Sequence, residues 1–131
     1  MTNYLYNTVE MRENVIQKKS YEFAVKIVLL YKKIVRQHND FIISKQLLRC
    51  WTSIWANVEE ANGWQSKKDF LSKMSIAYKE ARESDYWLRI LKDTQMISKE
   101  EYTTINNLLQ EILKIITKIQ TTTKENIKNN F

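Results

Sequence analysis

The sequence predicts an all-α protein that folds as an antiparallel, up-down-up-down four-helix bundle. Its 131 residues include one Gly and no Pro, so it lacks the residues on which the turns of a β-rich fold depend. Apolar residues recur at spacings of three and four along four stretches, which is the period of an amphipathic helix. The connections between these stretches are short, and short connections make consecutive helices antiparallel neighbours. We expect one domain, with the bundle in residues 13–120.

The first helix is expected from about residue 13 to residue 36, after an irregular segment at residues 1–12. Its apolar stripe consists of Tyr21, Ala24, Ile27, Val28, Tyr31, Ile34 and Val35. The polar residues 37–40 then break the helix.

The second helix is the most informative part of the sequence. It is expected to begin near Ile43 or Ser44 and to end at Gly63, the only Gly, which suits a left-handed helix terminator. Its apolar stripe is Leu47, Trp51, Ile54, Val58 and Ala61, widened by Leu48 and Trp55. A second stripe is polar and consists of Gln46, Arg49, Ser53, Asn57 and Glu60. Short amides and a hydroxyl suit a packed seam between helices better than a fully solvated face.

Two capping-box patterns mark the starts of the last two helices, Ser66 with Asp69 and Ser98 with Glu101. The third helix has the stripe Phe70, Met74, Ala77, Ala81, Ser84, Leu88 and Leu91. The fourth has Tyr102, Ile105, Leu108, Leu109, Ile112, Leu113, Ile115, Ile116 and Ile119. Residues 121–131 have no sustained apolar face, so a frayed tail is expected there.

No catalytic or metal-binding constellation is evident in the sequence. A di-iron bundle uses two Glu-x-x-His motifs, and this chain has only one histidine, His38. Zinc needs about four Cys or His ligands, whereas only Cys50 and His38 are present. One Gly excludes a Gly-rich phosphate loop. We therefore expect no enzymatic activity, no metal and no cofactor.

Glu80 and Glu83 are open to two interpretations. Together with Glu59 and Glu60 they could be paired catalytic acids, or they could be charges that flank the core stripe of the third helix. The second interpretation is favoured, and it predicts that one of them pairs with Arg49, because a partly buried charge needs an opposite partner. Gln46, Arg49, Ser53, Asn57, Glu60, Glu80 and Glu83 together form the expected polar seam.

The formal net charge of +6 is compatible with a polyanionic partner such as RNA or DNA, although it also suits simple solubility. Candidate phosphate contacts lie at the end of the first helix and along the third. They are Lys32, Lys33, Arg36, Lys67, Lys68, Lys73, Lys79, Arg82 and Arg89. No element that reads bases is evident, so weak sequence selectivity is expected.

The apolar residues exceed what a single bundle needs. The apolar arc of the second helix is wide, and four Trp and seven Tyr add to it. Self-association is favoured over a well-packed monomer. A single cysteine fits a reducing compartment, and there is no signal-peptide pattern and no apolar run long enough for a bilayer, so a bacterial cytoplasmic location is expected.

The sequence resembles the four-helix-bundle proteins encoded in intervening sequences of bacterial 23S rRNA genes. Their relatives include the accessory variability determinant of diversity-generating retroelements. The resemblance lies in KKSYEFA at 18–24, QLLR at 46–49, Ser53, Ile54, ANVEEA at 56–61, SKKDF at 66–70, and Ala77, Glu80, Ala81 and Glu83. Trp55 stands where the family usually has Pro, which predicts a second helix with less kink or none.

The resemblance implies a homopentameric barrel with a basic outer surface. It also implies binding to nucleic acid, in one branch binding to a reverse transcriptase, and no enzymatic activity. Two functions remain open: an oligomeric nucleic-acid-binding protein, accessory to rRNA or to a reverse transcriptase, and a protein-interaction scaffold with no nucleic-acid role. A small-molecule enzyme is a third and weaker alternative.

Overall fold

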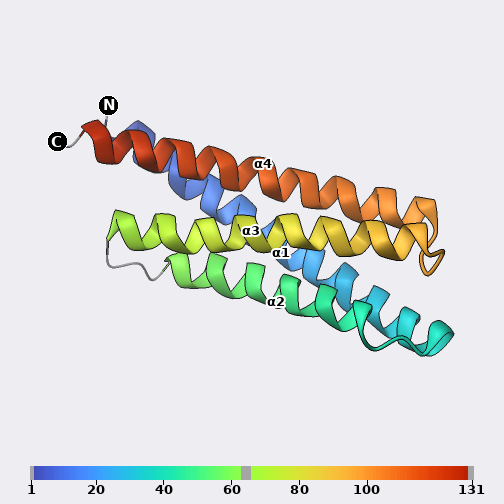
Figure 1. The fold of residues 1–131 in the computed structure, drawn as a ribbon. Helices are drawn as coiled ribbons and strands as arrows, with labels where there is room; N and C mark the ends of the chain where they lie inside the picture. Colours follow the sequence, from blue (N-terminus) through green and yellow to red (C-terminus); the bar gives the residue numbers. More distant parts are fainter. Residues whose placement is uncertain (1, 63–65, 130–131) are drawn as a thin grey trace.

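The computed structural model is an all-α bundle, described here for residues 2–62 and 66–129, with side chains at 15–61 and 66–129. This part of the chain forms four helices and no strand: α1 (Thr2–His38), α2 (Ile43–Asn62), α3 (Lys67–Asp93) and α4 (Lys99–Asn129). Each helix packs on the next, and α4 returns to pack on α1 (Figure 1). The predicted four-helix architecture is confirmed, whereas its assembly into a pentamer stays a prediction.

The helices are longer at both ends of the chain than the sequence indicated. α1 begins at Thr2, so the irregular segment expected at 1–12 is wrong for the described residues. α4 continues to Asn129, so the frayed tail expected at 121–131 is also wrong up to that point. Thr123 is buried there, and its hydroxyl is satisfied by donating to the Ile119 carbonyl at 2.7 Å. Once a helix is nucleated, each further residue adds a backbone hydrogen bond at little cost.

The break between α1 and α2 is built by two adjacent polar residues. Asn39 takes a positive φ of 51°, which Asn tolerates better than most residues, and its N–H bonds back to the Val35 carbonyl. The Asp40 carboxylate then accepts from the backbone N–H groups of Ile42 and Ser44 at 3.3 and 3.1 Å. These bonds satisfy donors that α2 leaves open at its start.

The capping box predicted at Ser98 is complete, and the one predicted at Ser66 is present in part. The Ser66 hydroxyl accepts from the Asp69 N–H at 3.1 Å. At α4 the exchange is reciprocal, because Ser98 accepts from the Glu101 N–H and Glu101 accepts from the Ser98 N–H, both at 3.0 Å. The expected terminator Gly63 lies outside the described residues.

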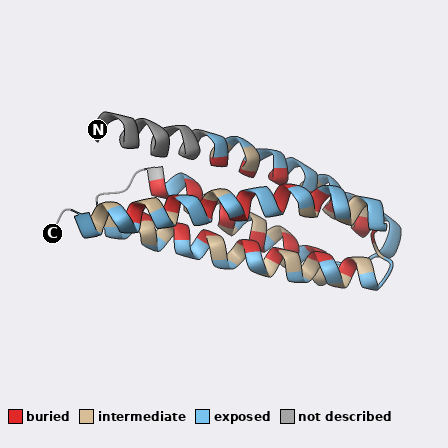
Figure 2. Ribbon diagram, turned by 90° about the horizontal axis from the view of Figure 1, so that it is seen from above, coloured by how far each residue is buried: buried red, intermediate tan, exposed pale blue. Residues whose placement is uncertain are grey.

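The core lies along the bundle axis, where buried residues of the four helices face one another (Figure 2). The whole predicted stripe of α3 is buried. In α4 the predicted stripe is buried except for Tyr102 and Ile115, which pack against the core from its edge. In α2, which runs without a break through Trp55, the predicted stripe is buried except for half-buried Trp51.

The buried face of α1 differs from the predicted one. Tyr21 was expected in the core but is 62% exposed, and Val28, Tyr31 and Val35 lie at the edge. The buried side chains follow a strict alternation of four and three, and they are Ile16, Ser20, Phe23, Ile27, Leu30 and Ile34, with Ala24 beside them. Residues 23–35 are apolar around most of the helix, so several stripes compete in the sequence. Packing against α2 and α4 selects one of them.

Candidate functional site

The polar seam is centred on an ion-pair cluster between α2 and α3. The Arg49 guanidinium lies 2.6 Å from a Glu83 carboxylate oxygen and 3.5 Å from one of Glu80. The predicted pairing is therefore present, with both glutamates instead of one. Gln46 accepts from Arg49 Nε at 3.1 Å and holds the guanidinium from its own helix. Glu80 and Glu83 are one turn apart on α3, so a single planar cation reaches both.

The rest of the seam is less packed than expected. Ser53 and Asn57 are half-buried and bond to each other, with Asn57 Nδ2 donating to the Ser53 carbonyl at 2.8 Å. Glu60 is exposed and pairs with Lys73 of α3 at 2.7 Å. The seam thus follows the rim of the interface between α2 and α3, where one edge of each side chain stays in water.

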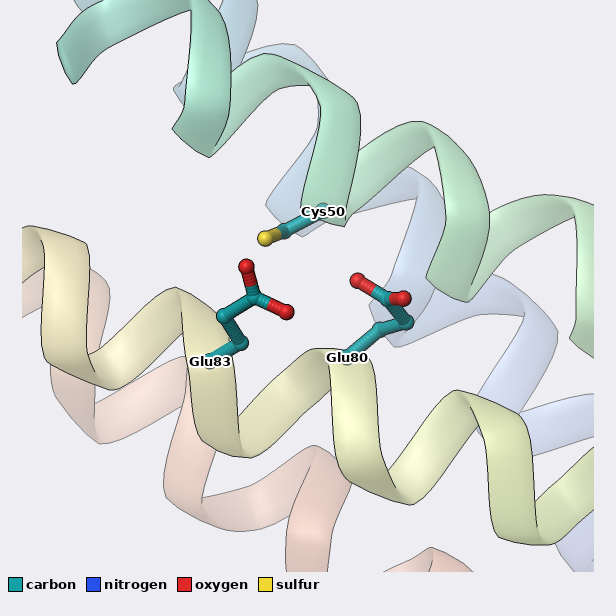
Figure 3. A group of neighbouring side chains, drawn as sticks. All are labelled: Cys50, Glu80 and Glu83. Carbon is teal, nitrogen blue, oxygen red and sulfur yellow. The ribbon is translucent and has the colours of Figure 1, made fainter.

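Cys50 completes the cluster from the buried side, a role the sequence analysis did not assign to it. Its side chain is fully buried and points from α2 toward the carboxylates of Glu80 and Glu83 (Figure 3). Burial first, and then the charge of Glu83, raises the pKa of the thiol to about 12, against the opposing effect of Arg49. The thiol is therefore protonated at neutral pH and is a poor nucleophile.

Cys50, Glu80 and Glu83 are also the one group of potential metal ligands in the described part of the chain. Their ligand atoms lie within 4.8 Å of one another. Arg49 already pairs with both carboxylates, and a metal would have to displace this cation as well as the thiol proton. His38, the other candidate ligand, is exposed in the last turn of α1. The cluster is best explained as a structural ion pair.

The nine basic residues proposed for phosphate contact do not form one patch. Lys32, Lys33 and Arg36 lie near the end of α1, whereas Lys67 and Lys68 begin α3 at the opposite end of the bundle (Figure 1). Lys79 and Arg82 lie midway along α3 and are exposed. A single site would therefore use only a subset of them.

Three of the nine are engaged in ion pairs. Lys33 lies 2.6 Å from Glu101, Lys73 pairs with Glu60, and Arg89 lies 3.3 Å from Asp85. Their charges are largely compensated within the protein, which makes them weaker candidates for phosphate contact. The other six form no ion pair within the described residues, and they are Lys32, Arg36, Lys67, Lys68, Lys79 and Arg82.

A groove of about 680 Å³ runs between α3 and α4 and contains two lysines that the sequence analysis missed. Arg82 lines it from α3, and Lys114 and Lys118 line it from α4. The other lining residues are Tyr78, Asp85, Gln110, Leu113, Thr117 and Thr121. The spacing of four between Lys114 and Lys118 was the available signal, but only the fold places it opposite Arg82.

Exposed apolar side chains gather on α1 and on its connection to α2, not on the α2 arc where they were expected. Trp51 is partly covered by α1, since its Nε1 donates to the Ser20 carbonyl at 3.2 Å. In contrast, Tyr21, Val25 and Leu29 are exposed at intervals of four along α1. Phe41 and Ile42 follow in the connection, at 55% and 77% exposure.

The family model of the 23S rRNA-intervening sequence protein matches residues 12–118, most of the chain. The chain belongs to this family. The match covers most of the bundle, including the ion-pair cluster and both walls of the groove up to Lys118. None of the curated proteins compared matches the chain.

A solved structure agrees with this family assignment. It is the crystal structure of a protein with unknown function from the S23 ribosomal protein family of Bacteroides thetaiotaomicron. The two sequences are 48% identical, and the alignment covers 84% of this chain and 98% of the other, with a TM-score of 0.82. As for the expected location, no helix in the described residues has both the length and the apolar character that a membrane crossing requires.

Proposed function

We propose that this 23S rRNA-intervening sequence protein is a non-enzymatic, self-associating protein that binds nucleic acid with weak sequence selectivity. The observation that carries the proposal is the set of exposed cations without an acidic partner in the described chain, on a protein with a net charge of +6. Such charges attract phosphates and release condensed counterions when they bind. An accessory role toward rRNA or toward a reverse transcriptase is the biological setting we infer from the family resemblance.

Binding is expected to weaken steeply with salt and to differ little between unrelated sequences. Each phosphate contact contributes about 0.7 to the slope of log K against log salt for a single strand and about 0.9 for a duplex. Fluorescence anisotropy with several RNA and DNA sequences, from about 50 to 200 mM KCl, measures this slope. A slope near zero, or no binding at the lowest salt, would remove the proposal.

The second candidate is a protein-interaction scaffold, which the exposed apolar side chains of α1 and its connection favour. An acidic polypeptide added to the anisotropy assay separates the two candidates. Unlabelled nucleic acid is the reference competitor, and both competitors are compared at equal concentrations of negative charge. If the polypeptide displaces the labelled nucleic acid at a much lower concentration, the basic surface serves a protein partner.

Self-association is expected to use the exposed apolar line Tyr21, Val25 and Leu29, because water disfavours a contiguous apolar face. Size exclusion with light scattering should give a multiple of the 15.8 kDa chain mass, five copies in the assembly that the family resemblance implies. Leu29→Glu should shift the mass toward one chain. Gln37→Glu, exposed on the same helix and equal in charge change, is the control. A wild-type monomer at micromolar concentration would contradict self-association.

A further inference from the structure

The groove between α3 and α4 has an excess of positive charge that its own residues do not neutralise. Arg82, Lys114 and Lys118 form no ion pair within the described residues. The one acid that lines the groove, Asp85, is bound by Arg89 at 3.3 Å and accepts from the Tyr102 hydroxyl at 3.4 Å. The Asp85 carboxylate is therefore occupied by Arg89 and Tyr102, and the three cations of the groove stay available to a ligand.

The position of Arg82 is controlled by a neighbour on its own helix. Arg82 donates to the Tyr78 hydroxyl at 3.4 Å, and the Tyr78 ring packs against the core. This contact holds the guanidinium at the α3 wall. On the α4 wall, Lys114 and Lys118 are four residues apart, about 6 Å along the helix axis. The cations therefore line an elongated path between two walls.

The dimensions and the uncharged lining residues restrict the ligand further. A volume of about 680 Å³ lies within the range of pockets that hold small molecules, about 300–1,000 Å³, so a short stretch of one nucleic-acid backbone fits inside the groove. Gln110, Thr117 and Thr121 are polar and uncharged. The Thr117 and Thr121 hydroxyls already donate to the Leu113 and Thr117 carbonyls at 2.8 and 2.9 Å, so the three cations are the main donors to a phosphate. An extended, narrow polyanion fits these features.

We propose that this groove binds the sugar–phosphate backbone of single-stranded nucleic acid, with Arg82 on one wall and Lys114 and Lys118 on the other in contact with its phosphates. The proposal rests on the proposed function and adds to it the location and the strandedness of the ligand. The other five unpaired candidates lie outside the groove and then contribute only to long-range attraction; they are Lys32, Arg36, Lys67, Lys68 and Lys79.

The test compares two double variants that lose the same charge. The groove variant combines Lys114→Ala with Lys118→Ala and removes both cations of the α4 wall. The control variant combines Lys26→Ala with Lys45→Ala and removes two exposed lysines outside the groove. Anisotropy with a labelled single strand of mixed sequence measures affinity across the salt series. We expect the groove variant to bind roughly tenfold more weakly at low salt, with a slope reduced by about 1.4 per occupied groove. The control variant should change both quantities much less.

The other outcomes separate a failure of the groove proposal from a failure of the proposed function. If wild type binds but the two double variants lose affinity equally, the charge acts diffusely; the groove proposal is overturned and the proposed function stands. The groove proposal is also overturned if wild type binds a duplex of the same sequence more tightly than the single strand. It is overturned as well if inorganic phosphate displaces the labelled strand as effectively as an unlabelled strand does at the same total concentration of phosphate groups. If wild type does not bind any nucleic acid, the proposed function itself fails. Circular dichroism of each variant confirms that the helices are intact.

Discussion

Phe23→Ala is expected to lower the free energy of unfolding by about 3–5 kcal/mol, the largest effect among the substitutions considered. Phe23 is fully buried in the core cluster, to which all four helices contribute. Truncation removes the apolar area of the ring and leaves a cavity that the surrounding helices cannot fully close. Urea unfolding followed by circular dichroism measures the loss, at one fixed protein concentration because self-association would add to stability.

Tyr21→Ala is the matched control, since it removes an aromatic ring two residues away on the same helix. Tyr21 is 62% exposed and meets Trp55 edge to face at 6.2 Å between ring centroids. Because Tyr21 belongs to the apolar line proposed for self-association, both variants are compared in the Leu29→Glu background, where the chain is expected to be monomeric. There the loss of Tyr21 should cost about 1 kcal/mol or less. If Tyr21→Ala is as destabilising as Phe23→Ala in the monomer, α1 presents a different face to the core.

Arg49→Ala is expected to have the second-largest effect, a loss of about 1–2 kcal/mol. The substitution leaves Glu80 and Glu83, with side chains 15% and 33% exposed, side by side without their shared cation. Because Arg49 itself is half exposed, water screens part of the repulsion and keeps the loss below that of a fully buried pair. The melting temperature at neutral pH should fall by several degrees.

Two further variants show whether the loss comes from the stranded carboxylates. Lys19→Ala breaks a 2.6 Å pair with Glu111, exposed at 31% and 52%, and should cost less than 1 kcal/mol. Arg49→Met combined with Glu80→Gln and Glu83→Gln removes all three charges and should recover most of the stability. An unchanged melting temperature in Arg49→Ala would contradict the structural role of the cluster.

The candidate sites were predictable only where the signal lies within one helix or in charge complementarity. Arg49 was matched to Glu80 and Glu83 because a partly buried guanidinium needs carboxylates, and the i, i+3 spacing of the two glutamates puts them on one face. The contribution of Cys50 to that cluster was not foreseen, because its orientation depends on how α2 rotates against α3. The same holds for Lys114 and Lys118, which lie on the helix after that of Arg82 and face it only once α3 and α4 have packed.

By itself, the sequence determined the helical class, the capping at Ser66 and Ser98, and the buried face of α3, where one narrow apolar stripe is flanked by charges. Burying any other face of α3 would bury unpaired charge, so there was a single low-energy choice. Tertiary structure alone decided the face of α1 and the groove between α3 and α4. Residues 23–35 of α1 are apolar around most of the helix. Several rotations of α1 about its own axis would therefore bury a similar apolar area. Shape complementarity with α2 and α4 then selects the rotation that buries Phe23 and leaves Tyr21 in solvent.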